Sequence, residues 1–151
     1  MEKITLAIAL TALISGSAFA KEYITHADLY QLQSSGEQKL LTSGDIVNDT
    51  DGSYSSPLTG SATLPESKET YNTFLVSKVY KDKQDRIILS YNFELTKPER
   101  SGINGDSEED KLLSLETYSA HQSLVMNETE KDIPFMSADK NYILRLKVSE
   151  K

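Results

Sequence analysis

The sequence lacks cysteine and tryptophan and contains only two histidines in 151 residues. Because cysteine is absent, the chain cannot form disulfides, thiolate metal sites or a thiol nucleophile. It also lacks the cysteine that carries the lipid of a bacterial lipoprotein. No Gly-x-Ser-x-Gly segment supports a Ser-His-acid site, and we expect His26 and His121 to be exposed or edge residues. We therefore predict that the protein is not an enzyme and has no catalytic residue, metal ligand or cofactor.

Basic residues are in deficit, with 16 Lys and Arg against 23 Asp and Glu, for a net charge of −7. An acidic chain is repelled by polyphosphate and by anionic lipid, so we expect no nucleic-acid partner. The excess charge fits solubility. The segment 47–58 resembles a calcium loop around Gly52, but Leu58 stands at the twelfth position, where an acidic ligand is required. A turn at Asp51-Gly52 is the better interpretation.

Long hydrophobic runs are missing apart from residues 4–14, which are apolar except for two threonines. This run is shorter than the roughly 20 residues that cross a bilayer. It follows Lys3 and precedes Ala18-Phe19-Ala20, which has the small-x-small pattern of a signal-peptidase site. We predict a cleaved signal peptide over 1–20, with Ala18 and Ala20 at the cleavage site. The mature chain 21–151 would then be periplasmic or secreted, of bacterial origin, and without a membrane span.

Alternating hydrophobicity is the strongest structural pattern in the mature chain. Segment 86–96 alternates polar residues with Ile87, Leu89, Tyr91, Phe93 and Leu95, which is typical of a strand with one face in a core. Segment 71–80 is rich in aromatic and β-branched residues, and the polar link 81–85 predicts a central antiparallel hairpin. Segment 142–148 repeats the alternation near the C-terminus.

Weaker strands are predicted at 24–33, 39–47, 112–118 and 123–126. Segments 48–67 and 97–111 contain proline, glycine and clustered polar residues, so we predict long loops there, with at most a short helix near 107–112. No stretch of the mature chain shows a helical repeat over three turns. These features predict a single all-β domain, an antiparallel two-sheet sandwich of immunoglobulin-like or Greek-key type with about seven strands.

One short stretch supports the sandwich class. Residues 133–142 resemble the corner that leads into a late strand of immunoglobulin-like or fibronectin-like sandwiches. In that corner a tyrosine at the start of the strand hydrogen-bonds to upstream backbone. The resemblance implies this role for Tyr142.

An open sheet edge that accepts a partner strand is the binding mode that we favour for such a sandwich. We predict a non-enzymatic binding or accessory module of the bacterial cell envelope. The first candidate interaction loop holds the acidic residues Asp106, Glu108, Glu109 and Asp110, and the turn at 49–54 is the second. One alternative is a fimbria-like structural subunit that donates residues 21–33, although such subunits usually carry a disulfide and a penultimate tyrosine. Another is an acidic inhibitor that presents 97–111 to a basic enzyme.

Overall fold

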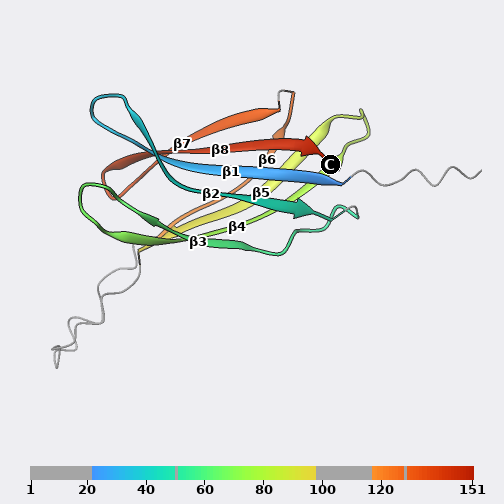
Figure 1. Ribbon diagram of the computed structural model, residues 1–151. Coiled ribbons are helices and arrows are strands. Elements are labelled where there is room, and N and C mark those ends of the chain that lie inside the picture. The colour runs from blue at the N-terminus through green and yellow to red at the C-terminus, as the bar shows by residue number, and fades with distance from the viewer. Residues whose placement is uncertain (1–21, 50, 98–116, 128) are drawn as a thin grey trace, which may run out of the picture.

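The computed structural model describes residues 22–49, 51–97, 117–127 and 129–151. These residues form two antiparallel sheets of four strands each, stacked face to face (Figure 1). The strands are β1 (Tyr23–Leu32), β2 (Gln38–Asn48), β3 (Leu58–Thr63), β4 (Thr70–Lys81), β5 (Ile87–Thr96), β6 (Thr117–Val125), β7 (Glu130–Ser137) and β8 (Lys140–Glu150). The predicted all-β sandwich is confirmed. In the part of the chain described, no helix has the length and hydrophobicity needed to span a membrane.

Strand order places the two described ends of the chain together. The first sheet has the order β2-β1-β8-β7, so the first and last strands pair, and the Lys151 amide donates to the Glu22 carbonyl at 2.9 Å. The second sheet, β3-β4-β5-β6, is a simple meander. Neither sheet has the spatial order of a Greek key, so that finer prediction is not confirmed. Edge strands of the two sheets meet on two sides of the sandwich, one where β2 lies beside β3 and one where β7 faces β6.

The core follows from the alternation within the strands. Inward-facing residues of the central strands are almost fully excluded from solvent, including Tyr91 at 0% and Leu144 at 2% exposure. Both had been predicted to face the core, and this is confirmed. β4 and β5 pair over the full length of β5, which confirms the predicted central hairpin.

A buried polar network also joins the two sheets. The Asn48 side-chain amide of β2 donates to Thr25 Oγ1 at 2.8 Å, and the Ser77 hydroxyl of β4 donates to Asn48 Oδ1 at 2.6 Å. Ser55 completes it, because its amide donates to the Ser77 carbonyl and its hydroxyl accepts from the Ser77 amide. Each of these side chains is buried and hydrogen-bonded, as an apolar interior requires.

The structure corrects three predicted elements, giving eight strands in the described residues instead of about seven. The predicted loop 48–67 contains β3, a short edge strand bounded by Pro57 and Pro65. Residues 119–122, predicted to separate two weak strands, lie inside β6. Residues 112–116 lie outside the described part of the chain, as do those of the predicted short helix.

The predicted corner at 133–142 is wrong. β7 and β8 are hydrogen-bonded neighbours in one sheet and are joined by Ala138 and Asp139, which both have positive φ. This is the backbone of a two-residue hairpin turn. Pro134 is tolerated because β7 is an edge strand. Tyr142 is buried within this sheet with its ring stacked on Phe135.

Candidate functional site

The side of the sandwich between β6 and β7 is filled by aromatic rings. Phe135 of β7 stacks on Tyr118 of β6 at a centroid distance of 4.1 Å and on Tyr142 of β8 at 5.1 Å. Phe93 of β5 meets Phe135 edge-on at 5.8 Å. These contacts join the sheets across the gap, so this side is closed by packed side chains.

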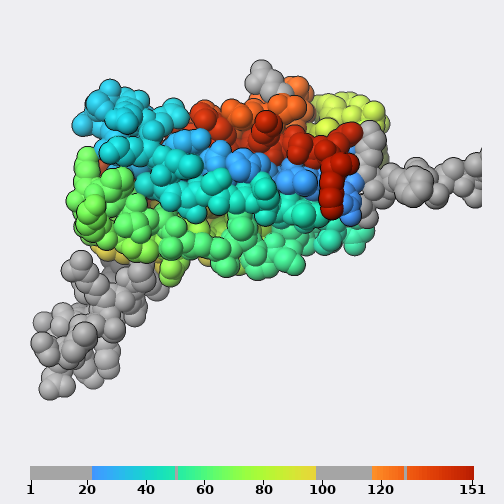
Figure 2. All heavy atoms as spheres, viewed as in Figure 1, coloured from blue at the N-terminus to red at the C-terminus, as the bar shows by residue number. Residues whose placement is uncertain are grey.

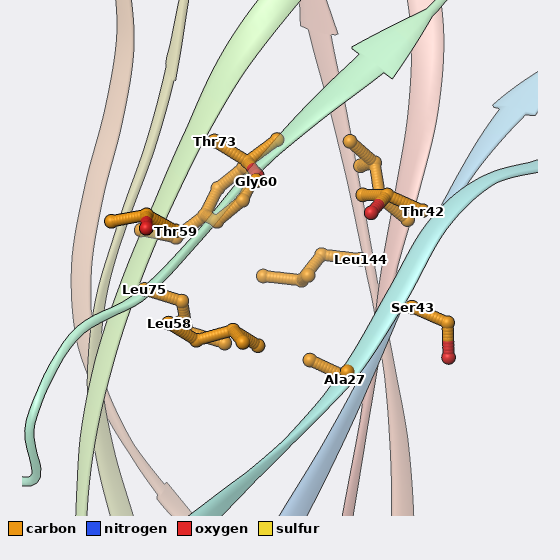
Figure 3. Close-up of a pocket in the computed structure, with 12 residues that line it drawn as sticks. Ala27, Thr42, Ser43, Leu58, Thr59, Gly60, Thr73, Leu75 and Leu144 are labelled. Atoms are coloured by element: carbon orange, nitrogen blue, oxygen red, sulfur yellow. The ribbon is translucent and has the colours of Figure 1, made fainter.

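The opposite side, between β2 and β3, holds a cavity of about 50 Å³. Its inner wall is apolar and includes Leu29, Leu75, Phe93 and Leu144, while Thr42 and Thr73 lie beside it as hydroxyl-bearing residues. Figure 3 shows Leu144 pointing into the space between the sheets, with Leu75 and Leu58 on one side and Thr42 on the other. The cavity is therefore a hydrophobic space that is reached between the edge strands β2 and β3.

Two glycines allow the edges of β2 and β3 to approach each other. A Cβ on Gly44 of β2 would lie 2.8 Å from Leu58 Cδ2 of β3, closer than real Cβ contacts. A Cβ on Gly60 of β3 would lie 3.2 Å from Thr73 Oγ1 and 3.7 Å from Thr42 Oγ1. The missing side chains bring the strands together at these points while leaving the cavity between them unfilled.

A second, shallower hollow of about 290 Å³ continues along the same side. It is lined by Asp45, Ile46, Val47, Ser56, Pro57 and Leu58. Leu58 lines both hollows. We call the surface formed by residues 42–47 and 56–60 the β2–β3 trough; β2 and β3 lie side by side across the face shown in Figure 2.

The β3 edge beside this trough carries no charge or proline, and β2 approaches it closely at Gly44 and Gly60. Residues 58–63 include no charged residue and no proline, and within the described chain β3 pairs only with β4. By contrast, the edge strand β7 carries Glu130, Lys131, Asp132 and Pro134. Charges and prolines on edge strands prevent pairing with other chains. The β3 edge is therefore the better acceptor for an added strand.

The outer face of the β2-β1-β8-β7 sheet carries a cluster around His26. Its Nδ1 lies 2.5 Å from Asp45 Oδ1, and its Nε2 lies 3.1 Å from Asp28 Oδ1 and 3.4 Å from Ser43 Oγ. The hydrogen bond with Asp45 is the main cause of a raised His26 pKa, and both aspartates add to it electrostatically. The imidazolium form is favoured because each ring nitrogen has a carboxylate to donate to.

Ser43, His26 and Asp45 have the residue types of a hydrolase triad, which the sequence had not suggested. A triad histidine must accept the serine proton at Nε2. Here Asp28 holds the Nε2 proton in place, so His26 is a poor general base toward Ser43. The group also lies on an open sheet face rather than in a pocket, with the His26 side chain 41% exposed. The described residues show no group of three or more side chains suited to hold a metal ion.

Tyr54, the last residue of the second-choice interaction turn 49–54, lies against the outer face of the other sheet. Lys78 Nζ lies 4.9 Å from the centre of the Tyr54 ring and 5.6 Å from that of Tyr80, and His121 is 6.3 Å from Tyr54. These cation–π contacts hold Tyr54 against β4. Tyr54 is thus part of the sandwich surface.

The first-choice residues Asp106, Glu108, Glu109 and Asp110 lie outside the described residues. Ala18 and Ala20 do as well. The structure therefore brings together a set that sequence reasoning missed, namely the glycines and threonines of the β2–β3 trough. Their signal was present only as two uncharged runs, 40–44 and 58–63, each with a glycine. No protein-family model matches this chain, and no curated protein matches it in sequence.

Proposed function

We propose that this chain is an exported, non-catalytic binding module of the bacterial cell envelope, and that it binds an extended segment of a partner protein along the β2–β3 trough. The observation that carries the proposal is the uncharged β3 edge beside a cavity that opens between the sheets. In strand addition, main-chain hydrogen bonds supply affinity, and pockets for alternate side chains supply specificity. The trough offers both features on one side of the molecule.

The size of the cavity favours a peptide over a free small molecule. Small-molecule sites usually measure about 300–1,000 Å³. An engineered cavity that binds benzene has about 150 Å³. The cavity here, at about 50 Å³, has room for one aliphatic side chain. A ligand that fills it must gain most of its affinity outside the cavity, as a paired strand does.

Export is supported by residues 1–20, whose charge, apolar run and small-residue site have the order of a signal peptide. The module is then periplasmic or secreted, and it works without disulfides in a compartment that permits them. We expect N-terminal sequencing of protein from the periplasmic or culture fraction to begin at Lys21. A cytoplasmic chain that keeps Met1 would contradict this part of the proposal.

A fimbria-like structural subunit is the second candidate, because the same β3 edge would accept a strand from another copy. The segment predicted to be donated, 21–33, is not free for this, since Tyr23–Leu32 forms β1 between β2 and β8. This candidate predicts polymers whose length depends on protein concentration. The inhibitor alternative depends on residues 97–111, most of which lie outside the described chain, and no observation in the structure favours it.

The test of binding uses a random peptide library displayed against the mature chain. We expect enrichment of extended, β-forming peptides. Ser61→Lys, which places a charge on the β3 edge, should abolish their binding. Ser119→Lys is the matched control, since Ser119 is also exposed and lies on β6, the other edge strand of the same sheet.

Retention of binding in Ser61→Lys together with loss in Ser119→Lys would mean that the peptide binds at the β6 edge and not at the β3 edge. Enrichment of no peptide by the wild-type chain would refute strand capture. Growth of polymers on concentrating the wild-type protein, blocked by Ser61→Lys, would favour the structural subunit.

A further inference from the structure

We infer that the β2–β3 trough selects peptides that place an aliphatic side chain in the cavity and a lysine or arginine at a neighbouring position, beside Asp45. This inference rests on the proposed function and specifies the chemistry of its ligand. It is carried by two neighbouring hollows of different character, one with an apolar inner wall and one rimmed by a carboxylate.

The aliphatic preference follows from the walls of the cavity. Leu29, Leu75 and Leu144 contribute hydrocarbon, and the last two differ in sheet, so a guest side chain would contact both layers of the core. Leu75 and Leu144 are 3% and 2% exposed, so water has little access to their surfaces. A polar guest group would lose its hydration there without a matched partner.

The spacing follows from strand geometry. Successive residues of an added strand face opposite sides. Gly44 lines the cavity and Asp45, the next residue on β2, lines the second hollow, with Leu58 shared by both. The Asp45 side chain lies on the outer face of its sheet, beside His26. A peptide residue next to the aliphatic anchor therefore faces outward, toward Asp45. Whether it lies N- or C-terminal to the anchor depends on whether the added strand runs parallel or antiparallel to β3.

The charge preference follows from the groups around Asp45. Its side chain is 65% exposed and uses Oδ1 for His26, and within the described residues Oδ2 has no partner. His26 is shared between Asp45 and Asp28, so a single positive charge at most is available to neutralise two carboxylates. The next cation, Lys147 of β8 opposite His26, itself faces Glu130 of β7.

The remaining cation on this face, Arg145, does not offset the negative charge at Asp45. Arg145 lies opposite Asp28 but donates to both Asp132 oxygens at 2.7 and 2.9 Å. The rim of the second hollow is therefore negative, in a chain whose net charge is −7. A basic side chain with a long flexible stem is the complementary group.

The experiment uses blocked nine-residue peptides of threonine with one central valine and a lysine immediately on either side of it, labelled for fluorescence anisotropy. Replacing the central valine by threonine keeps the shape and exchanges one methyl group for a hydroxyl, and we expect affinity to fall about tenfold. Replacing the lysines by glutamine should reduce affinity about two- to fivefold, an effect that salt should remove.

Two protein variants separate the subsites. Asp45→Asn should abolish the difference between lysine and glutamine peptides and preserve the difference between valine and threonine peptides. Ala27→Val adds two methyl groups to the cavity wall, where Ala27 is 6% exposed. It should raise Tm by filling the space, while the valine peptide loses about tenfold in affinity. A gain in stability with a loss of binding excludes damage to the fold as the cause.

The outcomes distinguish this inference from the proposed function. Peptides that bind wild type equally with either central residue and either charge, yet lose binding in Ser61→Lys, would overturn the selectivity and leave strand capture standing. If no peptide binds and Ser61→Lys has no effect in the library selection, strand capture itself is wrong.

Discussion

The two sides of this sandwich where edge strands of different sheets meet are filled differently. Between β6 and β7, Phe135 stacks against two tyrosines and joins the sheets. Between β2 and β3, the sheets approach through Gly44 and Gly60, and a cavity remains beneath them. Aromatic pairs add stability beyond their buried area, whereas unfilled space forfeits packing contacts.

The edge strands differ in the same sense. β7 carries Pro134 and three charges, which discourage pairing, while β3 carries neither. One side is thus filled by rings and bordered by a charged edge strand, and the other holds a cavity beside an uncharged one. Stability is concentrated where nothing can dock, which leaves the other side free for a partner.

The largest expected effect tests this asymmetry through stability. Phe135→Ala should lower the free energy of unfolding by about 3–5 kcal/mol, because it removes a ring that contacts three others. Leu58→Ala, on the trough side, should cost only about 1–2 kcal/mol, since Leu58 is half-buried and already borders empty space. Urea denaturation of both variants gives the comparison. Equal losses would mean that the two sides contribute alike.

The next effect concerns the polar link between the sheets. Asn48→Ala should cost about 2–3 kcal/mol, because it leaves the buried Thr25 and Ser77 hydroxyls without their shared partner. Asn72→Ala is the control: Asn72 is exposed on β4, and its loss should stay within about 0.5 kcal/mol. Thermal unfolding followed by circular dichroism measures both. A near-neutral Asn48→Ala would show that water replaces the network.

The alternation of segments such as 86–96 and 142–148 was enough to predict the sandwich and its core faces, because burial of one face imposes period two on the sequence. β3 escaped prediction because Pro57, Gly60 and Pro65 are typical of loops. An edge strand tolerates them, since one side of its backbone needs no partner. The hairpin turn at Ala138-Asp139 escaped too, because it lacks the Asn-Gly pair that usually marks such turns.

The trough was harder still to predict from sequence. It joins residues 42–47 to residues 56–60 across two sheets, and no local pattern encodes which edges become neighbours. A glycine in a strand suggests close approach of another backbone. Gly44 and Gly60 follow that rule, but only the fold shows that they meet on the same side.

The smallest expected effect is a pH dependence centred on His26, at the end of the trough where Asp45 lies. Its folded pKa is raised above the ordinary 6.5, chiefly by the hydrogen bond with Asp45. The folded state therefore binds this proton more tightly than the unfolded state. The resulting stabilisation is fully present below 6.5 and is lost as pH rises through the folded pKa. Since the side chain is 41% exposed, solvent screening should keep the effect below about 1 kcal/mol.

His26→Gln tests this by chemical denaturation at about pH 5.5 and about pH 9. The variant should be less stable than wild type at the lower pH and approach it at the higher. His121→Gln keeps His26 and both of its carboxylates, so it should follow the wild-type profile. A His26→Gln deficit that is constant across this range would show that packing, not the proton, sets the contribution of His26. The same proton neutralises Asp45, so its loss at high pH should strengthen binding of the lysine peptide and leave the glutamine peptide unchanged.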